Sequence, residues 1–160
     1  MWGNLGFSYI GLIYLLMLMI PNIIWAKNKP LNYDTSKENK ILLFFERIGE
    51  VACTTSLIAF NNTNPSTINI RIIWLMISFC LMLAYEVYFI NYFKSEKTLN
   101  DFYGKFLGVL YPGATLPICA LLLLGIYGRL LPLIISTIVM AIGHIGIHHQ
   151  HYQDIINSNK

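Results

Sequence analysis

The stretch LGFSYIGLIYLLMLMIPNIIW at residues 5–25 contains no charged side chain. As an α-helix it is long enough to cross a hydrocarbon core of about 30 Å, because a helix rises about 1.5 Å per residue. Four further apolar stretches follow it, at residues 41–60, 71–93, 102–124 and 131–149. We therefore predict an all-α, polytopic integral membrane bundle of about five transmembrane helices.

The overall composition supports this class. Hydrophobic residues make up 56% of the 160 residues, charged residues only 12%, and the mean hydropathy is +0.56. These values are far from those of a soluble domain of this size. Because five spans would use most of the chain, we expect one transmembrane domain over residues 1–160 and no soluble module. The net charge of +3 does not indicate nucleic acid as a partner.

Basic residues are distributed unevenly between the two ends of the predicted bundle. One end carries only Arg71 and Arg129, whereas the other end carries Lys27, Lys29, Lys37, Lys40, Lys94, Lys97, Lys105 and Lys160. The positive-inside rule then places the N-terminus outside and the C-terminus in the cytoplasm. We expect a multi-pass protein of a cell membrane, most simply a bacterial plasma membrane, with the lipid bilayer as its main partner.

Several ionisable residues lie inside these apolar stretches. They are Glu46, Arg47 and Glu50 in the second stretch, Glu86 in the third, and His144 and His148 in the last. Each costs about 3 kcal/mol to insert, so such residues usually face a bundle interior or a wet cavity and often carry function. Counted at 1.5 Å per residue, all lie within about 14 Å of the cytoplasmic ends of their helices. We predict that they form one polar cluster in the cytoplasmic half of the bilayer.

The charge balance of this cluster leaves several interpretations open. Arg47 and Glu50 are three residues apart and can pair along one helix, which leaves two carboxylates uncompensated. These carboxylates could be protonated, paired with a protonated His144, or bound to a cation. In a purely structural alternative, Glu46 and His148 reach the membrane interface and Glu86 bonds a hydroxyl such as that of Tyr111.

Metal binding is a specific form of the cation hypothesis. His144 and His148 have the i, i+4 spacing of metal ligands on one helix face, and Glu50 and Glu86 could complete a divalent-metal site. His144, His148 and His149 form H-x-x-x-H-H, which resembles one histidine box of the membrane fatty-acid desaturases and hydroxylases. That family uses three such boxes for a di-iron centre, whereas this chain has four histidines, all between residues 144 and 151. A site of that type would require Glu46, Glu50 and Glu86 to replace the missing ligands.

The fourth apolar stretch contains both helix-breaking and close-packing signals. Pro112 and Pro117 predict a broken or bent helix. Gly104 and Gly108 form G-x-x-x-G, which predicts close approach to a neighbouring helix.

No catalytic motif selects one function, so three hypotheses remain. The first is a cation- or proton-binding component of a transport system, in which Glu50, Glu86 and His144 bind the ion. Its odd number of spans and lack of an internal repeat favour a homo-oligomer or a partner membrane subunit. The second is a membrane enzyme, with or without a metal, that acts on a lipid or apolar substrate at the inner leaflet. The third is an accessory or scaffold subunit whose polar residues only fix helix packing.

Overall fold

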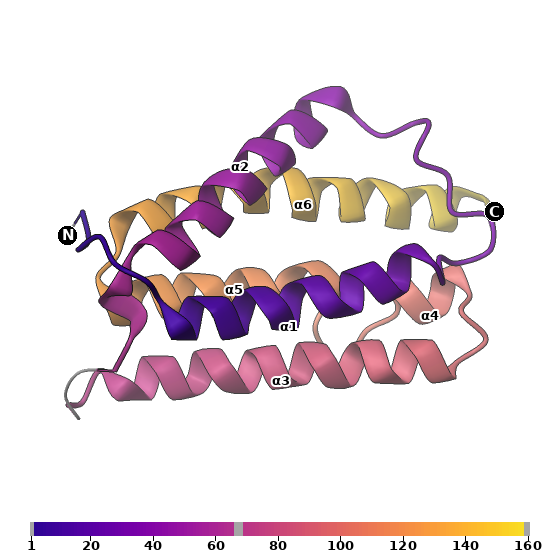
Figure 1. Cartoon of the computed structure of the whole chain (residues 1–160). Helices are drawn as coiled ribbons and strands as arrows, with labels where there is room; N and C mark the ends of the chain where they lie inside the picture. Colours follow the sequence, from indigo (N-terminus) through magenta and orange to yellow (C-terminus); the bar gives the residue numbers. More distant parts are fainter. Residues whose placement is uncertain (1, 66–68, 159–160) are drawn as a thin grey trace.

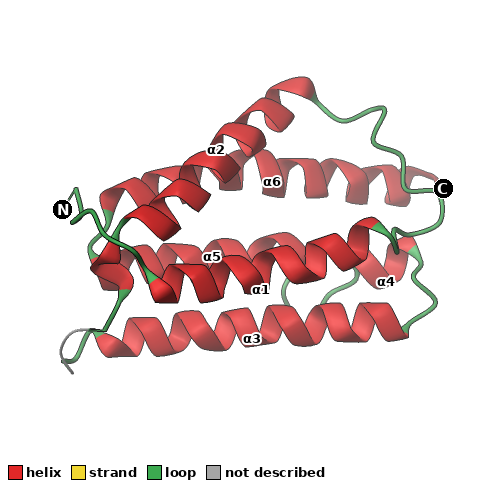
Figure 2. Cartoon of the chain, viewed as in Figure 1, coloured by secondary structure: helices red, strands yellow, loops and turns green. Residues whose placement is uncertain are grey.

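The computed structural model describes residues 2–65 and 69–158, and this part of the chain is helical without strands. The long helices are α1 (Tyr9–Ala26), α2 (Lys40–Ala59), α3 (Ile72–Lys94), α5 (Pro112–Gly128) and α6 (Leu131–Ser158). Two short elements are η1 (Asn61–Thr63) and α4 (Leu99–Tyr103). The long helices alternate in direction, and the ends of the chain lie at opposite ends of the bundle (Figures 1 and 2).

Three of the helices are long and apolar enough to cross a membrane: α1, α3 and residues 131–157 of α6. The apolar helix α5 has 17 residues and is shorter than these. Helix α2 has 20 residues but carries Lys40, Glu46, Arg47 and Glu50 along its length. The all-helical prediction and its membrane-compatible character are therefore confirmed, with three clear candidate spans.

The region predicted as one span at residues 102–124 is divided in the structure. Phe102 and Tyr103 end the short helix α4, a non-helical segment follows, and α5 begins only at Pro112. Proline suits the first turn of a helix, where its missing N–H costs no hydrogen bond. The G-x-x-x-G prediction is wrong, because Gly104 and Gly108 lie in this non-helical segment, where Gly108 has a φ of +79°.

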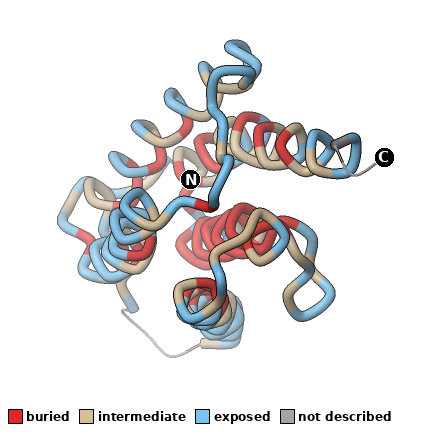
Figure 3. The backbone as a smooth tube through the Cα atoms, turned by 90° about the vertical axis from the view of Figure 1, so that its right-hand side faces the viewer, coloured by how far each residue is buried: buried red, intermediate tan, exposed pale blue. Residues whose placement is uncertain are grey.

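Helix α5 forms the centre of the bundle. Its buried residues include Ala114, Leu116, Ala120, Leu121 and Leu124. Figure 3 shows the buried residues concentrated along a central helix, with exposed residues on the helices around it. The outward faces of α1 and α3 are apolar and exposed, as expected for helices that meet lipid.

Helices α2 and α6 cross very closely, and glycine makes this crossing possible. A Cβ atom at Gly49 would overlap the backbone of Met140, and one at Gly143 would overlap the backbone of Glu46 and the carbonyl of Leu42. Small residues are the usual means by which membrane helices bring their backbones together. This contact, rather than the predicted one at Gly104 and Gly108, fixes α2 against α6.

Gly143→Ala tests the crossing. We expect it to lower the free energy of unfolding in mild detergent by about 1–3 kcal/mol, because the added methyl group meets backbone that cannot move aside. Gly146→Ala is the matched control on the same helix, since its Cβ would meet only the flexible side chain of Leu42. Thermal unfolding of both variants provides the measurement. Equal stability of the two variants would contradict a backbone-to-backbone crossing.

Candidate functional site

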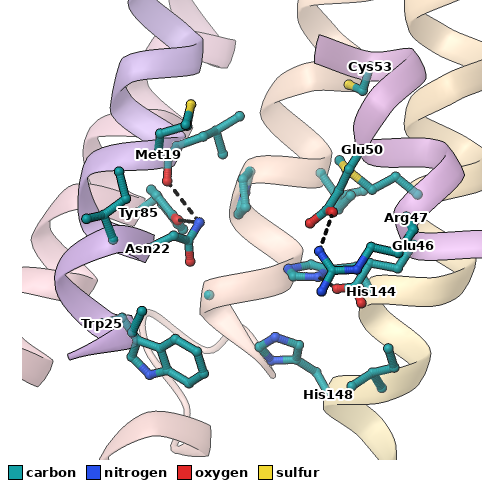
Figure 4. Close-up of a pocket in the computed structure, with 18 of the residues that line it drawn as sticks. Met19, Asn22, Trp25, Glu46, Arg47, Glu50, Cys53, Tyr85, His144 and His148 are labelled. Carbon is teal, nitrogen blue, oxygen red and sulfur yellow. Dashed lines mark hydrogen bonds and ion pairs between the residues drawn. The ribbon is translucent and has the colours of Figure 1, made fainter. Parts of the chain in front are cut away.

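A cleft of about 680 Å³ lies among α1, α2, α5 and α6. Its apolar walls include Leu15, Leu18, Leu57, Ile118 and Leu121. The polar side chains gather toward the end of the bundle that carries the 27–39 loop, and Figure 4 shows them on both walls. They include Asn22, Lys29, Glu38, Glu46, Arg47, Glu50, His144 and His148.

The shape of the cleft follows from how α1 is attached. At one end Gly11 packs against the carbonyl of Leu57, and Ser8 both caps α1 and lies 2.6 Å from the hydroxyl of Thr63. Toward the other end α1 and α2 separate (Figure 1). α1 and α2, which form two sides of the cleft, therefore pack together at one end and separate toward the other.

A short hydrogen bond joins α2 to α6 in the wall of the cleft. Nδ1 of His144 donates to Oε1 of Glu46 at 2.5 Å, with 26% of the histidine side chain and 13% of the glutamate side chain exposed. The backbone contact of Gly143 with Glu46 brings these neighbouring side chains to the same level. The sequence predicted that both residues belong to one cluster, and the structure shows their direct contact.

Arg47 and Glu50 form the ion pair along α2 that their i, i+3 spacing predicts. Arg47 pairs with Oε2 of Glu50 through NH1 at 3.1 Å, and 71% of the Arg47 side chain and 44% of the Glu50 side chain are exposed. This pair therefore contributes little to stability.

The histidines of α6 divide between two faces of the helix. His144 and His148 line the cleft, and Nε2 of His151 donates to Oε1 of Glu38, which also lines it, at 3.0 Å. His149 points elsewhere, and its Nδ1 is hydrogen-bonded to the hydroxyl of Tyr111 at 2.9 Å. The predicted hydrogen bond between the Tyr111 hydroxyl and Glu86 is therefore not formed. The ring of His148 lies beside that of His144, with centroids 4.8 Å apart and planes tilted by 55°, and has no hydrogen-bond partner in the described part of the chain.

Glu86 is separate from this site. It is half-buried on α3 and does not line the cleft, whereas its neighbour Tyr85 does. Among the described residues it has no hydrogen bond or ion pair. Glu86 therefore does not join Glu46 and His144 in one cluster, although all three were predicted to lie at a similar depth in the bilayer.

The proposed metal ligands do not come together as one metal site. In residues 2–65 and 69–158, no group of three or more His, Cys, Asp or Glu side chains is arranged to hold a metal ion. The combination of His144, His148, Glu50 and Glu86 is thus unsupported, and so is a desaturase-type ligand set.

Sequence reasoning missed the contribution of the 27–39 loop and of α4. Tyr33 stacks on the ring of His151, and burial raises the pKa of Tyr33 to about 12, so its hydroxyl stays protonated near neutral pH. Phe102 of α4 stacks on Trp25 with ring centroids 5.2 Å apart. The Thr98 and Asp101 side chains form the capping box that starts α4, and these bonds lower the pKa of Asp101. The T-x-x-D pattern was the available signal for this short helix.

A double-mutant cycle tests the contact between α2 and α6. We expect Glu46→Gln and His144→Gln to show a coupling energy of about 1.5–3 kcal/mol, the range for hydrogen bonds to charged groups. Unfolding in mild detergent gives the four free energies. Glu86→Gln combined with His144→Gln is the control and should be additive. Additivity in the first cycle would mean that the observed pair carries no interaction.

Comparisons with known proteins yield no relative for this chain. No family model, no curated protein and no solved structure matches it. Its function must be inferred from the chemistry of the cleft.

Proposed function

We propose that this chain is a multi-pass protein of a cell membrane in which α1, α2, α3, α5 and α6 all span the bilayer. The apolar helices α1, α3 and α6 support this directly. Glu46, Arg47 and Glu50 of α2 line the cleft, so the helix can span without presenting these side chains to lipid.

The distribution of lysine supports an orientation with the N-terminus outside. Because the helices alternate, the described lysines, at positions 27, 29, 37, 40, 94, 97 and 105, belong to one end of the bundle, and Arg71 and Arg129 belong to the other. Lys160 lies outside the described residues. The lysine-bearing end is then cytoplasmic.

Cysteine labelling tests this orientation. In a variant without the three native cysteines, we expect Leu5→Cys to react with an impermeant maleimide in intact cells and Glu96→Cys to react only after permeabilisation. Both positions are exposed, and neither change alters a lysine or an arginine. The reverse pattern would contradict the proposed orientation, and labelling of both in intact cells would contradict the three spans proposed between them.

We further propose that the protein is a proton-binding component of a transport system. The observation that carries this proposal is the hydrogen bond between His144 and Glu46 in the wall of an open cleft. Histidine–carboxylate pairs inside a bilayer are characteristic of proton pathways, since either partner can take up a proton as the other reorients. Nearby ionisable groups are Arg47 and Glu50 of α2, His148 of α6, Lys29 and Glu38 of the loop, and Tyr85 of α3. A homo-oligomer or a partner subunit would complete such a system.

The same pair favours one alternative. A histidine oriented by a carboxylate is also a typical general base, so an enzyme that acts on an apolar substrate at the inner leaflet is the second candidate. The scaffold hypothesis predicts a closed and fully paired contact, because a pair that only holds two helices together does not need to face a cleft.

Proton uptake by liposomes separates these functions. A potassium gradient with valinomycin sets an inside-negative potential, and an internal pH dye reports proton entry. We expect faster acidification with the wild type than in protein-free liposomes, and loss of this excess in Glu46→Gln and His144→Gln. Glu86→Gln is the matched control and should retain the wild-type rate, because Glu86 lies outside the cleft. A wild type no faster than empty liposomes would show that this chain does not conduct protons on its own, which would favour the enzyme and scaffold hypotheses.

A further inference from the structure

The cleft has the shape of a binding site for an amphipathic molecule. Its volume of about 680 Å³ is within the range of small-molecule sites. Leu15, Leu18 and Met19 of α1 and Ile118 and Leu121 of α5 provide apolar walls, and Ile118 and Leu121 are buried in the bundle. The polar residues lie at one end, so one end of a ligand would meet hydrocarbon and the other would meet charge.

The charge that is free to meet a ligand at the polar end is positive. Each of the carboxylates that line the cleft, Glu38, Glu46 and Glu50, already has a basic partner. Lys29 has no ion-pair partner among the described residues. Its Nζ lies only over the aromatic rings of Trp25 and Tyr33, at 5.4 and 5.6 Å from their centroids.

Further hydrogen-bond donors at this end lack acceptors. Arg47 uses only NH1 for Glu50 and leaves most of its guanidinium accessible. The His148 ring lines the cleft without a hydrogen bond in the described part of the chain, and the indole N–H of Trp25 is buried without an acceptor. Because an unmatched buried donor costs about 1–3 kcal/mol, a ligand that supplies an acceptor to the indole of Trp25 would be favoured.

We propose that this cleft binds an anionic membrane lipid whose phosphate head group carries no cationic substituent, with an acyl chain along α1 and α5 and the phosphate near Arg47 and Lys29. Arginine and lysine are the side chains that recognise phosphate, and basic pockets between spans on the cytoplasmic side bind anionic lipid head groups. This inference rests on the membrane placement proposed above but not on proton conduction.

Quenching of Trp25 fluorescence by brominated lipids tests the proposal. Trp2 and Trp74 are exposed and can be replaced by Phe, which leaves Trp25 in the cleft as the only reporter. In neutral detergent micelles, we expect saturable quenching by brominated phosphatidate that unbrominated phosphatidate reverses. Brominated phosphatidylcholine should quench only weakly. A brominated fatty acid tests whether a carboxylate serves equally well.

Two pairs of substitutions locate the head group. Lys29→Gln with Arg47→Gln should weaken phosphatidate binding by about tenfold, which equals about 1.4 kcal/mol. Lys94→Gln with Lys105→Gln removes the same charge from the same end of the bundle outside this cleft and should leave binding unchanged. All four residues are exposed, so the variants should fold, and circular dichroism with gel filtration checks this.

Four outcomes would overturn the proposal. They are absence of saturable quenching, equal quenching by phosphatidylcholine, equal or tighter binding of the fatty acid, and equal weakening by the two pairs of substitutions. Because binding is measured in micelles and the proton assay uses variants of Glu46 and His144, each proposal can fail without the other.

Discussion

The crossing of α2 and α6 at Gly49 and Gly143 is the constraint on which the rest of the site depends. Inside a bilayer no hydrophobic force draws two apolar helices together, so close backbone packing has to supply the attraction. Here it also sets position, because Gly143 rests on the backbone of Glu46 and precedes His144. The geometry of the His144–Glu46 pair is therefore set by the backbone contact between the two helices that carry it.

The second constraint acts at the opposite end of the cleft. Ser8, Thr63 and the contact of Gly11 with Leu57 fasten α1 to α2 near the N-terminus. Because α2 is also fixed to α6, its N-terminal half diverges from α1 and leaves space between them (Figure 1). The ionisable residues of α2 lie in that diverging half, where the cleft can hold water or a polar head group and the cost of burying charge is reduced.

Sequence reasoning predicted features that depend on one helix and missed those that depend on two. The apolar lengths predicted helices, and the spacing of Arg47 and Glu50 predicted their pair. Depth along an axis, however, does not determine which neighbour a side chain faces. One residue step is a rotation of about 100°, which places Tyr85 on the cleft and Glu86 away from it. Likewise, the sequence shows a G-x-x-x-G motif on one segment, but the close crossing is made by Gly49 and Gly143, which lie on different helices. Each packs against the backbone of the other helix, and a motif on one segment cannot reveal such a contact.

Charge balance connects the two proposed activities of the cleft. Lys29 and Arg47 face Glu38, Glu46 and Glu50, so these five groups have a net charge of −1 while His144 and His151 are neutral. Protonation of both histidines changes the net charge to +1. A phosphate head group would then bind more tightly to the protonated cleft, and by linkage its binding would favour proton uptake. Under the two proposals, an anionic lipid and a proton would be cooperative ligands of one site, because each would lower the electrostatic cost of the other.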